Sequence, residues 1–505
     1  MIFPIPLTLL LASIPILSSS VSVSAQSTVI PLTAHHSRQY SDDLETRQSW
    51  LKGQARGLRK KYQDHLGERG QDLLKRDVLE ADYELSRRSL GRRASGSVQL
   101  TDVGIDASYS GQVSIGSPAQ DFLLIMDTGS SDLWVAGSTC ESSSCTGVST
   151  FQSSSSTSYS TSNAAFNISY GSGDADGYLA TDTVSLAGFT VTGQTFAVVT
   201  STTARLISSP LSGLMGLAWK SIASSKATPF WQALAASGSW TDAEMGFYLA
   251  RYRGDNYATS VETEGGELVL GGTNTSKYTG SINYVSIDSD DLDYWRIPVQ
   301  GTTVQGSQIS ISSSGSPQAA IDTGTTLIGV PTTVAQSIYS QISGSEALSA
   351  SSGYDGYYQY PCDTTVNVTL QFGGLSYSIS QADMNLGSFT RDTSMCTGAF
   401  FEMDLSTTSP IQWIVGASFL KNVYTTFRYN PSAIGFAQLA NGVQSVSNGT
   451  TSSSTTGGGT SGSGGTGSGS GSSSSGSLPT INLNSNVGIV VLFSTFVGGI
   501  LAHLL

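Results

Sequence analysis

Two stretches of the 505-residue sequence each place an aspartate between an apolar run and a Thr-Gly turn. The first is IMDTGSSDLWV at 125–135, around Asp127, and the second is AIDTGTTLIGV at 320–330, around Asp322. If both aspartates reach one site, the two like charges cannot both ionise easily, so the pair shares a proton. The ionised member can then take a proton from water while the protonated member polarises a carbonyl. The pair therefore predicts amide hydrolysis without a metal or a cofactor.

The flanking residues fit such a site. The apolar run before each aspartate predicts a strand that fixes its backbone, and Gly129 and Gly324 allow a tight turn whose N–H groups face the carboxylates. Ser130 and Thr325 place a hydroxyl group within reach of each. One D-T-G alone is equally compatible with an ordinary turn. Two copies in matching surroundings favour the catalytic interpretation.

The positions of the histidines exclude other chemistries. The four histidines are His35, His36, His65 and His503, so residues 94–486 contain none. This excludes Ser-His-Asp and Cys-His catalysis and HExxH zinc sites in that region. No glycine-rich loop precedes a Lys-Ser or Lys-Thr pair, so a P-loop is absent. Carboxylate chemistry remains.

Charge divides the chain at about residue 93. Residues 26–93 hold 14 of the 24 Lys and Arg residues but 10 of the 37 Asp and Glu residues. The acidic remainder argues against a nucleic-acid partner, because binding to phosphates needs Lys and Arg. We interpret 26–93 as a basic propeptide that ends at Arg93 and pairs with the acidic body at neutral pH. The alternative is a solvated basic linker.

The two ends of the chain predict secretion and attachment to a membrane. Residues 1–25 fit a signal peptide, since small residues precede Gln26, although a buried helix is the alternative. Residues 442–486 form a predicted stalk rich in Ser, Gly and Thr. The apolar tail 487–505 fits a GPI-attachment signal better than a transmembrane helix. The expected location is extracellular, at the plasma membrane or the cell wall.

Cysteines and sequons also fit a secreted protein. Four cysteines predict two disulfides; local pairing, Cys140–Cys145 and Cys362–Cys396, is the simplest of three possible connectivities. Candidate glycan acceptors are Asn167, Asn274, Asn367 and Asn448.

Residues 98–441 have the pattern of a β protein, with short Val-, Ile-, Thr- and Tyr-rich runs between turns. Residues 166–186 predict a hairpin with a glycine-rich tip. Residues 331–342 predict a helix, with a proline at its start.

These motifs resemble the pepsin-like aspartic endopeptidases over residues 107–440. The resemblance is carried by YSGQVSIGSPAQDFLLIMDTGSSDLWV (109–135), NISYGSG (167–173), GLMGLAW (213–219), YWRIPVQGTTVQG (294–306) and WIVGASFLKNVYTTF (413–427). It implies an all-β, bilobal protease domain, 94–441, with two β-rich lobes and a central cleft. The N-lobe would span about 98–290 and the C-lobe about 291–441.

The resemblance also implies roles for single residues. Asp127 and Asp322 would be the catalytic dyad, Ser130 and Thr325 would bond their outer oxygens, and Thr128 and Thr323 would lock the two loops together. Tyr170, Gly171 and Ser172 would belong to a flap over the substrate, with Trp134 bonded to the tyrosine. The local disulfide pairing is also implied.

The expected activity is acid endopeptidase action on extended peptides, by a monomer whose own propeptide inhibits it. The stalk and tail resemble the fungal GPI-anchored, yapsin-like branch. The alternative function is a catalytically silent, protease-like surface binding protein. Asp174 and Asp176, just beyond the flap, would either favour basic substrate side chains or be solvated turn acids.

Overall fold

The computed structural model describes residues 28–35, 44–75, 106–170, 173–203, 206–253, 258, 261–311, 316–349 and 353–443, all within one unit of the chain. The predicted signal peptide, most of the stalk and the apolar tail lie outside these residues. Among the helices that the structure describes, none is long and apolar enough to cross a membrane.

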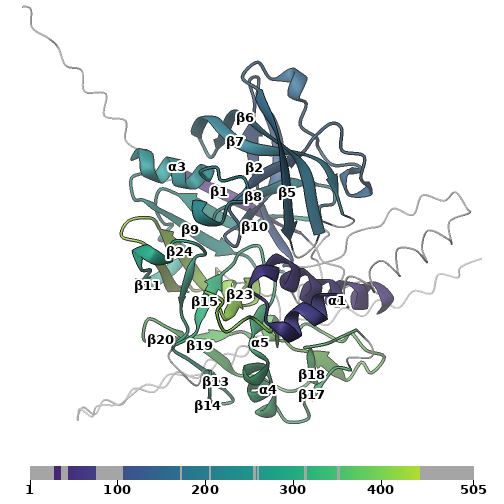
Figure 1. Cartoon of the computed structure of the whole chain (residues 1–505). Helices are drawn as coiled ribbons and strands as arrows, with labels where there is room; N and C mark the ends of the chain where they lie inside the picture. Colours follow the sequence, from purple (N-terminus) through teal and green to yellow (C-terminus); the bar gives the residue numbers. More distant parts are fainter. Residues whose placement is uncertain are drawn as a thin grey trace, which may run out of the picture. The chain divides into compact units, whose positions relative to one another are not determined.

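Strands dominate the described residues, as predicted (Figure 1). The largest sheet has 13 strands in the order β11-β25-β24-β9-β10-β1-β2-β3-β8-β4-β7-β6-β5. In chain order they are β1 (Thr28–His35), β2 (Ser108–Ile115), β3 (Gln120–Asp127), β4 (Leu133–Ala136), β5 (Ser160–Tyr170), β6 (Gly173–Leu186), β7 (Phe189–Thr202), β8 (Leu211–Gly216), β9 (Glu244–Leu249), β10 (Val261–Leu270), β11 (Tyr278–Ser286), β24 (Val423–Arg428) and β25 (Ala433–Leu439).

Three smaller sheets come from the second half of the chain. The first has the order β12-β15-β23-β16-β22, with β12 (Arg296–Pro298), β15 (Gln318–Ile321), β16 (Ile328–Val330), β22 (Phe400–Glu402) and β23 (Trp413–Val415). The second contains β13 (Gly301–Val304), β14 (Ser307–Ile309), β19 (Val368–Phe372) and β20 (Leu375–Ile379). The third contains β17 (Glu346–Ala347), β18 (Tyr358–Pro361) and β21 (Met395–Thr397).

One pairing pattern occurs twice, once around each aspartate. In the first half β3 pairs parallel with β8, β8 antiparallel with β4, and β4 parallel with β7. In the second half β15 pairs parallel with β23, β23 antiparallel with β16, and β16 parallel with β22. Each D-T-G therefore joins the first and third members of an equivalent four-strand set. This repeat fits the bilobal all-β fold expected from the sequence.

Helices are short apart from the first. They are α1 (Leu44–Lys61), α3 (Phe230–Ser237), α4 (Thr332–Ser340), α5 (Gln381–Met384) and α6 (Ala417–Leu420), with a further helical stretch at 68–75 and 3-10 turns η2 (Gln63–His65), η3 (Ser143–Cys145), η4 (Ser153–Ser155), η5 (Lys220–Ile222) and η6 (Ser289–Asp291). The predicted helix at 331–342 is confirmed as α4, and the predicted hairpin at 166–186 as β5 and β6.

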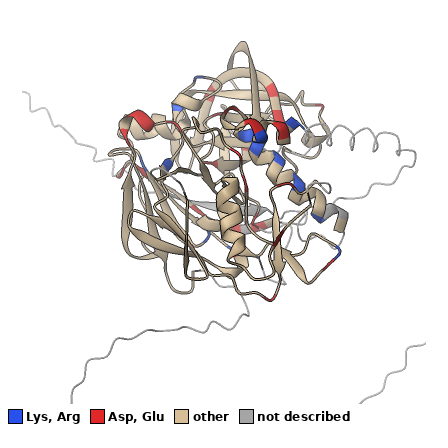
Figure 2. Ribbon diagram, turned by 60° about the horizontal axis from the view of Figure 1, so that its bottom comes forward, with Lys and Arg blue, Asp and Glu red and all other residues tan. Residues whose placement is uncertain are grey.

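The basic segment contributes both β1 and α1 to the fold. Strand β1 lies between β10 and β2 in the large sheet. Helix α1 buries Leu51, Ala55 and Leu58, followed by Tyr62, at a spacing of three and four residues that lines one face of a helix. Figure 2 shows the Lys and Arg positions in blue along the ribbon of this helix, against a body in which few positions are charged. The segment is therefore an integral part of this folded form.

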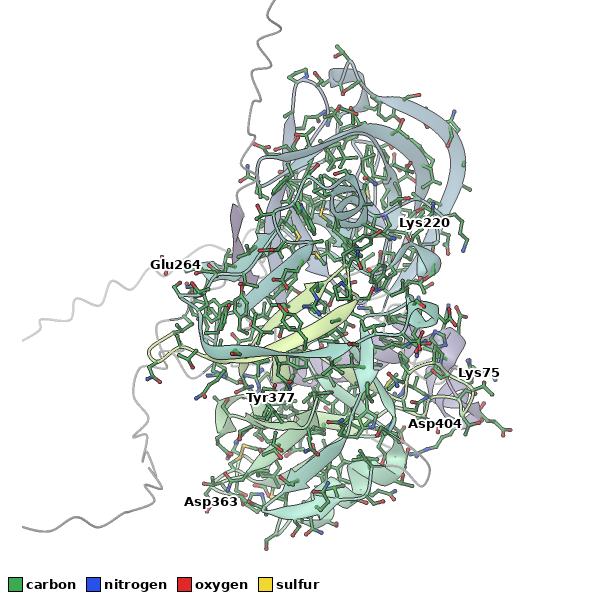
Figure 3. The ribbon with its side chains drawn as sticks, turned by 90° about the vertical axis from the view of Figure 1, so that its left-hand side faces the viewer. Lys75, Lys220, Glu264, Asp363, Tyr377 and Asp404 are labelled. Carbon is green, nitrogen blue, oxygen red and sulfur yellow. A yellow bond between two sulfur atoms is a disulfide. The ribbon has the colours of Figure 1, made fainter. Side chains whose placement is uncertain are left out.

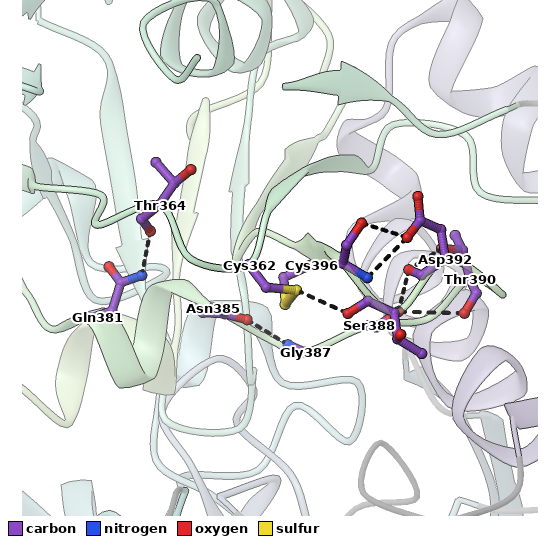
Figure 4. The surroundings of a disulfide bond; sticks show 11 residues. Cys362, Thr364, Gln381, Asn385, Gly387, Ser388, Thr390, Asp392 and Cys396 are labelled. Carbon is purple, nitrogen blue, oxygen red and sulfur yellow. Dashed lines mark hydrogen bonds between the residues drawn. A yellow bond between two sulfur atoms is a disulfide. The ribbon is translucent and has the colours of Figure 1, made fainter. Parts of the chain in front are cut away.

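Both locally paired disulfides are present, Cys140–Cys145 and Cys362–Cys396. The second closes a loop with a sequence separation of 34 residues and ties β18 to β21 (Figure 4).

Candidate active site

The two D-T-G turns hold their carboxylates by the same hydrogen bonds. Asp127 ends β3, and the N–H of Gly129 donates to its Oδ1 at 2.9 Å. Asp322 follows β15, and the N–H of Gly324 donates to its Oδ1, also at 2.9 Å. The hydroxyls of Ser130 and Thr325 donate to Oδ2 of their respective aspartates. Both carboxylates are almost completely buried.

The glycines are required because each lies against the opposite carboxylate. A Cβ added to Gly129 would lie 2.4 Å from Cγ of Asp322, and one added to Gly324 would lie 2.2 Å from Oδ1 of Asp127. Real Cβ contacts do not become so short. The two aspartates predicted to act together are therefore brought together.

The two threonines exchange hydrogen bonds between the loops. The N–H of Thr128 donates to Oγ1 of Thr323 at 3.0 Å, and the N–H of Thr323 donates to Oγ1 of Thr128 at 2.9 Å. Each hydroxyl also donates to a carbonyl of the opposite strand, Ile321 for Thr128 and Met126 for Thr323. All four residues of this arrangement are buried, so it fixes the separation of the carboxylates.

A cation from the basic segment fills the space at the dyad. Nζ of Lys61, the last residue of α1, lies 3.0 Å from Oδ1 of Asp127 and 2.8 Å from Oδ2 of Asp322. The hydroxyl of Tyr62 donates to the same Oδ2 at 3.0 Å. Sequence analysis did not identify Lys61, and the signal for it was the Arg59-Lys60-Lys61 run within a basic segment.

Burial and the neighbouring charges shift the pKa values of Asp127, Asp322 and Lys61 by different balances. Burial raises the pKa of Asp127 above its ordinary value, and the charge of Asp322 adds to this while Lys61 opposes it. Burial alone would also raise the pKa of Asp322, but the Lys61 charge and the hydrogen bonds from Lys61 and Thr325 outweigh it, so this pKa is lowered. Burial would lower the pKa of Lys61, but the two carboxylates raise it. The site therefore holds an ammonium group beside one readily ionised and one more readily protonated carboxyl.

The tyrosine of the β5–β6 hairpin also lies where the resemblance implied. Nε1 of Trp134 donates to the hydroxyl of Tyr170 at 2.9 Å, and both side chains are buried. Gly171 and Ser172, at the tip between β5 and β6, lie outside the described residues.

The basic segment is anchored on the second half of the chain beyond the dyad. Arg69 pairs with the buried Glu402 at 2.7 Å, and the N–H of Gly70 donates to Asp404 at 2.7 Å. Figure 3 shows Asp404 beside the ribbon of this segment. The ring of Trp50 stacks on Phe389, with centroids 5.6 Å apart.

Three of the four sequon asparagines are described. Asn167 and Asn367 are exposed, and Asn274 is partly exposed. Asn448 lies outside the described residues. Within the described part of the chain, no group of three His, Cys, Asp or Glu residues could hold a metal ion.

Comparison with known proteins agrees with this geometry. The family described as "Eukaryotic aspartyl protease" matches residues 108–439. The chain is 67% identical to "Major aspartyl peptidase 1" of Cryptococcus neoformans, over 88% of this chain and 91% of that protein. It is 34% identical to an "Aspartic protease" of Phaffia rhodozyma, over 73% and 86%, and 34% identical to "Pepsin A" of Sus scrofa, over 66% and 82%.

Proposed function

The chain belongs to the eukaryotic aspartyl protease family and is an aspartic endopeptidase, and we propose that Asp127 and Asp322 are its catalytic pair. The observation that carries this assignment is the mutual approach of the two carboxylates, each held by a glycine N–H and a hydroxyl and each touching Lys61.

In the open enzyme, a water molecule takes the place of the Lys61 ammonium group. One carboxylate accepts a proton from this water while the water oxygen attacks the peptide carbonyl carbon. The protonated partner donates to the carbonyl oxygen, giving a neutral diol. A proton then moves to the amide nitrogen, the C–N bond breaks, and the pair returns to sharing one proton. The reciprocal hydrogen bonds between Thr128 and Thr323 support these proton transfers, because they hold the two carboxylates at a fixed separation and proton transfer depends on short, fixed distances.

The basic segment is proposed to act as the inhibitor of the same site. It occupies the dyad through Lys61, and it is proposed to leave when acid protonates the carboxylates that hold it. The lowered pKa of Asp322 determines how the stability of the closed form depends on pH. Its contribution to that stability is full above the ordinary value of 3.8 and is lost as the pH falls further. Activity at acid pH follows from both this release and the shared proton.

The test is replacement of either carboxylate. Asp127→Asn and Asp322→Asn should each lower kcat for peptide cleavage at acid pH about a thousandfold or more, because neither amide can exchange the proton. Asp121→Asn, at an exposed position on the same strand as Asp127, is the matched control and should keep full activity. Cleavage that survives in either dyad variant would refute the assignment.

Secretion and surface attachment are proposed from the two ends of the chain. The apolar tail at 487–505, behind a Ser- and Gly-rich stalk, supports a GPI anchor and the yapsin-like branch. Glycans on the four sequons would suit the same location. A phosphatidylinositol-specific phospholipase should release the enzyme from cells; complete retention after digestion would instead favour a transmembrane helix.

The enzyme is proposed to act as a monomer on extended peptides, because one chain supplies both carboxylates and both supporting loops. A catalytically silent binding role has no observation in its favour, since both D-T-G turns are intact and meet.

A further inference from the structure

Two adjacent lysines of the basic segment bind two different acidic places. Lys61 contacts the dyad, while Nζ of Lys60 pairs with Oδ2 of Asp174. Adjacent Cα atoms lie about 3.8 Å apart, so Asp174 is reached from the residue next to the one at the catalytic centre. The Lys60 and Asp174 side chains are 22% and 23% exposed, so this pair is largely withdrawn from solvent.

The Asp174 carboxylate is held in position by the protein around it. Asp174 is the second residue of β6, and its backbone N–H donates to Oγ1 of Thr203 at 2.8 Å. Its Oδ1 accepts from the hydroxyl of Ser169 at 2.7 Å. Its Oδ2 is left for a ligand: among the described residues, Lys60 is its hydrogen-bond donor, and no second donor to this atom occurs there. A fixed carboxylate of this kind favours a cation, because a partly buried charge is costly without a partner.

Asp176, two residues further along β6, provides the contrast. Its carboxylate accepts from the side-chain amide of Asn167, it is exposed, and no cation of the described basic segment pairs with it. The two acids lie on the same face of one strand. Only Asp174 therefore has both the fixed geometry and the cation.

We propose that Asp174 determines specificity by binding the side chain of a substrate Lys or Arg close to the scissile bond. The inference rests on the proposed function, because substrate and basic segment then compete for one dyad. Once the segment leaves, Asp174 Oδ2 loses Lys60, and a cationic substrate side chain restores the pair. The substrate class is therefore extended peptides with one basic residue near the bond that breaks.

The experiment uses activated enzyme obtained from the full chain, as wild type, Asp174→Asn and Asp176→Asn. Each is given pairs of peptides that differ by one Lys or norleucine, at three positions on each side of the cleaved bond. Scanning both sides is necessary because α1 is helical whereas a substrate is extended. The readout is the ratio of kcat/KM for the Lys peptide to that for the norleucine peptide.

At one position the wild type should favour Lys by about five- to tenfold, and Asp174→Asn should abolish that ratio. Asp176→Asn should keep both the wild-type ratio of kcat/KM for the Lys and norleucine peptides and the wild-type activity on the norleucine peptide. The wild-type preference should also fall when the salt concentration is raised from about 0.05 M to about 0.5 M, because the Debye length then shortens from roughly 14 Å to roughly 4 Å.

An equal ratio in wild type and Asp174→Asn at every position would overturn the inference and leave the proposed function standing. An equal loss in Asp176→Asn would also overturn it, because the effect would then belong to the general negative field. If the wild-type enzyme cut none of the peptides, the proposed function itself would fail.

Discussion

At the scale of single residues, the site depends on what is missing from its two turns. Gly129 and Gly324 have no side chain, and each leaves room for the opposite carboxylate. Because the crowding atoms belong to buried, hydrogen-bonded carboxylates, they cannot move aside as a flexible chain end would.

Gly129→Ala and Gly324→Ala should therefore each lower kcat/KM of the activated enzyme at least a hundredfold, since a shift of about 1 Å at a catalytic group has that effect. Asp121→Asn is again the control, because Asp121 is exposed on β3 and lies in the part of the chain that remains in the activated enzyme. Peptide kinetics on the three variants check this. Normal kinetics in either dyad-loop variant would show that the turns can open without loss.

The positions of these residues could be predicted from the sequence because their contacts are local. The turn glycines, hydroxyls and threonines lie within three residues of an aspartate, and Trp134 lies on the strand that follows. Lys61 could not be assigned in this way. Its partner atoms lie 66 and 261 residues away, and 14 Lys and Arg residues of the basic segment compete for the role.

At the scale of elements, the proposed inhibition depends on α1. Its apolar face is buried, and its last residue meets both carboxylates. The sequence predicted a propeptide but named no element within it, because this helix is rich in charge and its apolar stripe is narrow. The hairpin and α4 were predicted because their turn residues and spacing are strong local signals.

Lys61→Met should weaken the closed form by about 3–5 kcal/mol, the usual effect of removing one partner from a buried charge pair. The uncut Lys61 variant should then begin to cleave peptides at a higher pH than the uncut wild-type chain, which should stay closed until acid releases the segment. The measurement compares both uncut chains, each with Arg93→Gln to delay processing. Lys52→Met, elsewhere on α1, is the control, because Lys52 lies over the ring of Tyr354 instead. Silence of the Lys61 variant would mean that the other contacts of the segment are sufficient.

At the scale of the whole molecule, a buried ion cluster joins distant parts of the chain. Lys421 lies 2.7 Å from Asp106 and 2.6 Å from Asp383, and Arg251 also pairs with Asp383. Burial alone would raise the pKa of Asp383, but Lys421 and Arg251 outweigh it and hold this pKa well below its ordinary value. The cluster links the start of β2 to the helices α5 and α6.

This cluster predicts a loss of stability in acid. A carboxyl with a lowered pKa stabilises the fold above its ordinary value of 3.8, and this contribution is lost as the pH falls below that value. Urea unfolding of the inactive Asp127→Asn chain should show a free energy that falls between pH 4 and 2, by at most about 1.4 kcal/mol per pH unit for each proton bound.

The same chain with Lys421→Met should be about 3–5 kcal/mol less stable at pH 6, and its free energy of unfolding should fall less on acidification, because Asp383 would already lack that cation. A pH dependence unchanged by this substitution would remove the cluster from the explanation. This cluster could not be predicted from the sequence, since its members are separated by up to 315 residues.

The four-strand pattern that surrounds each aspartate has a consequence for how such a chain can change over time. The four-strand pattern that holds one carboxylate in one half is the same pattern that holds the second carboxylate in the other half. Two copies of one ancestral half, associated face to face, would build a working centre before any fusion joined them. After fusion, the outer strands of each half are free to differ, while the eight central strands must continue to match.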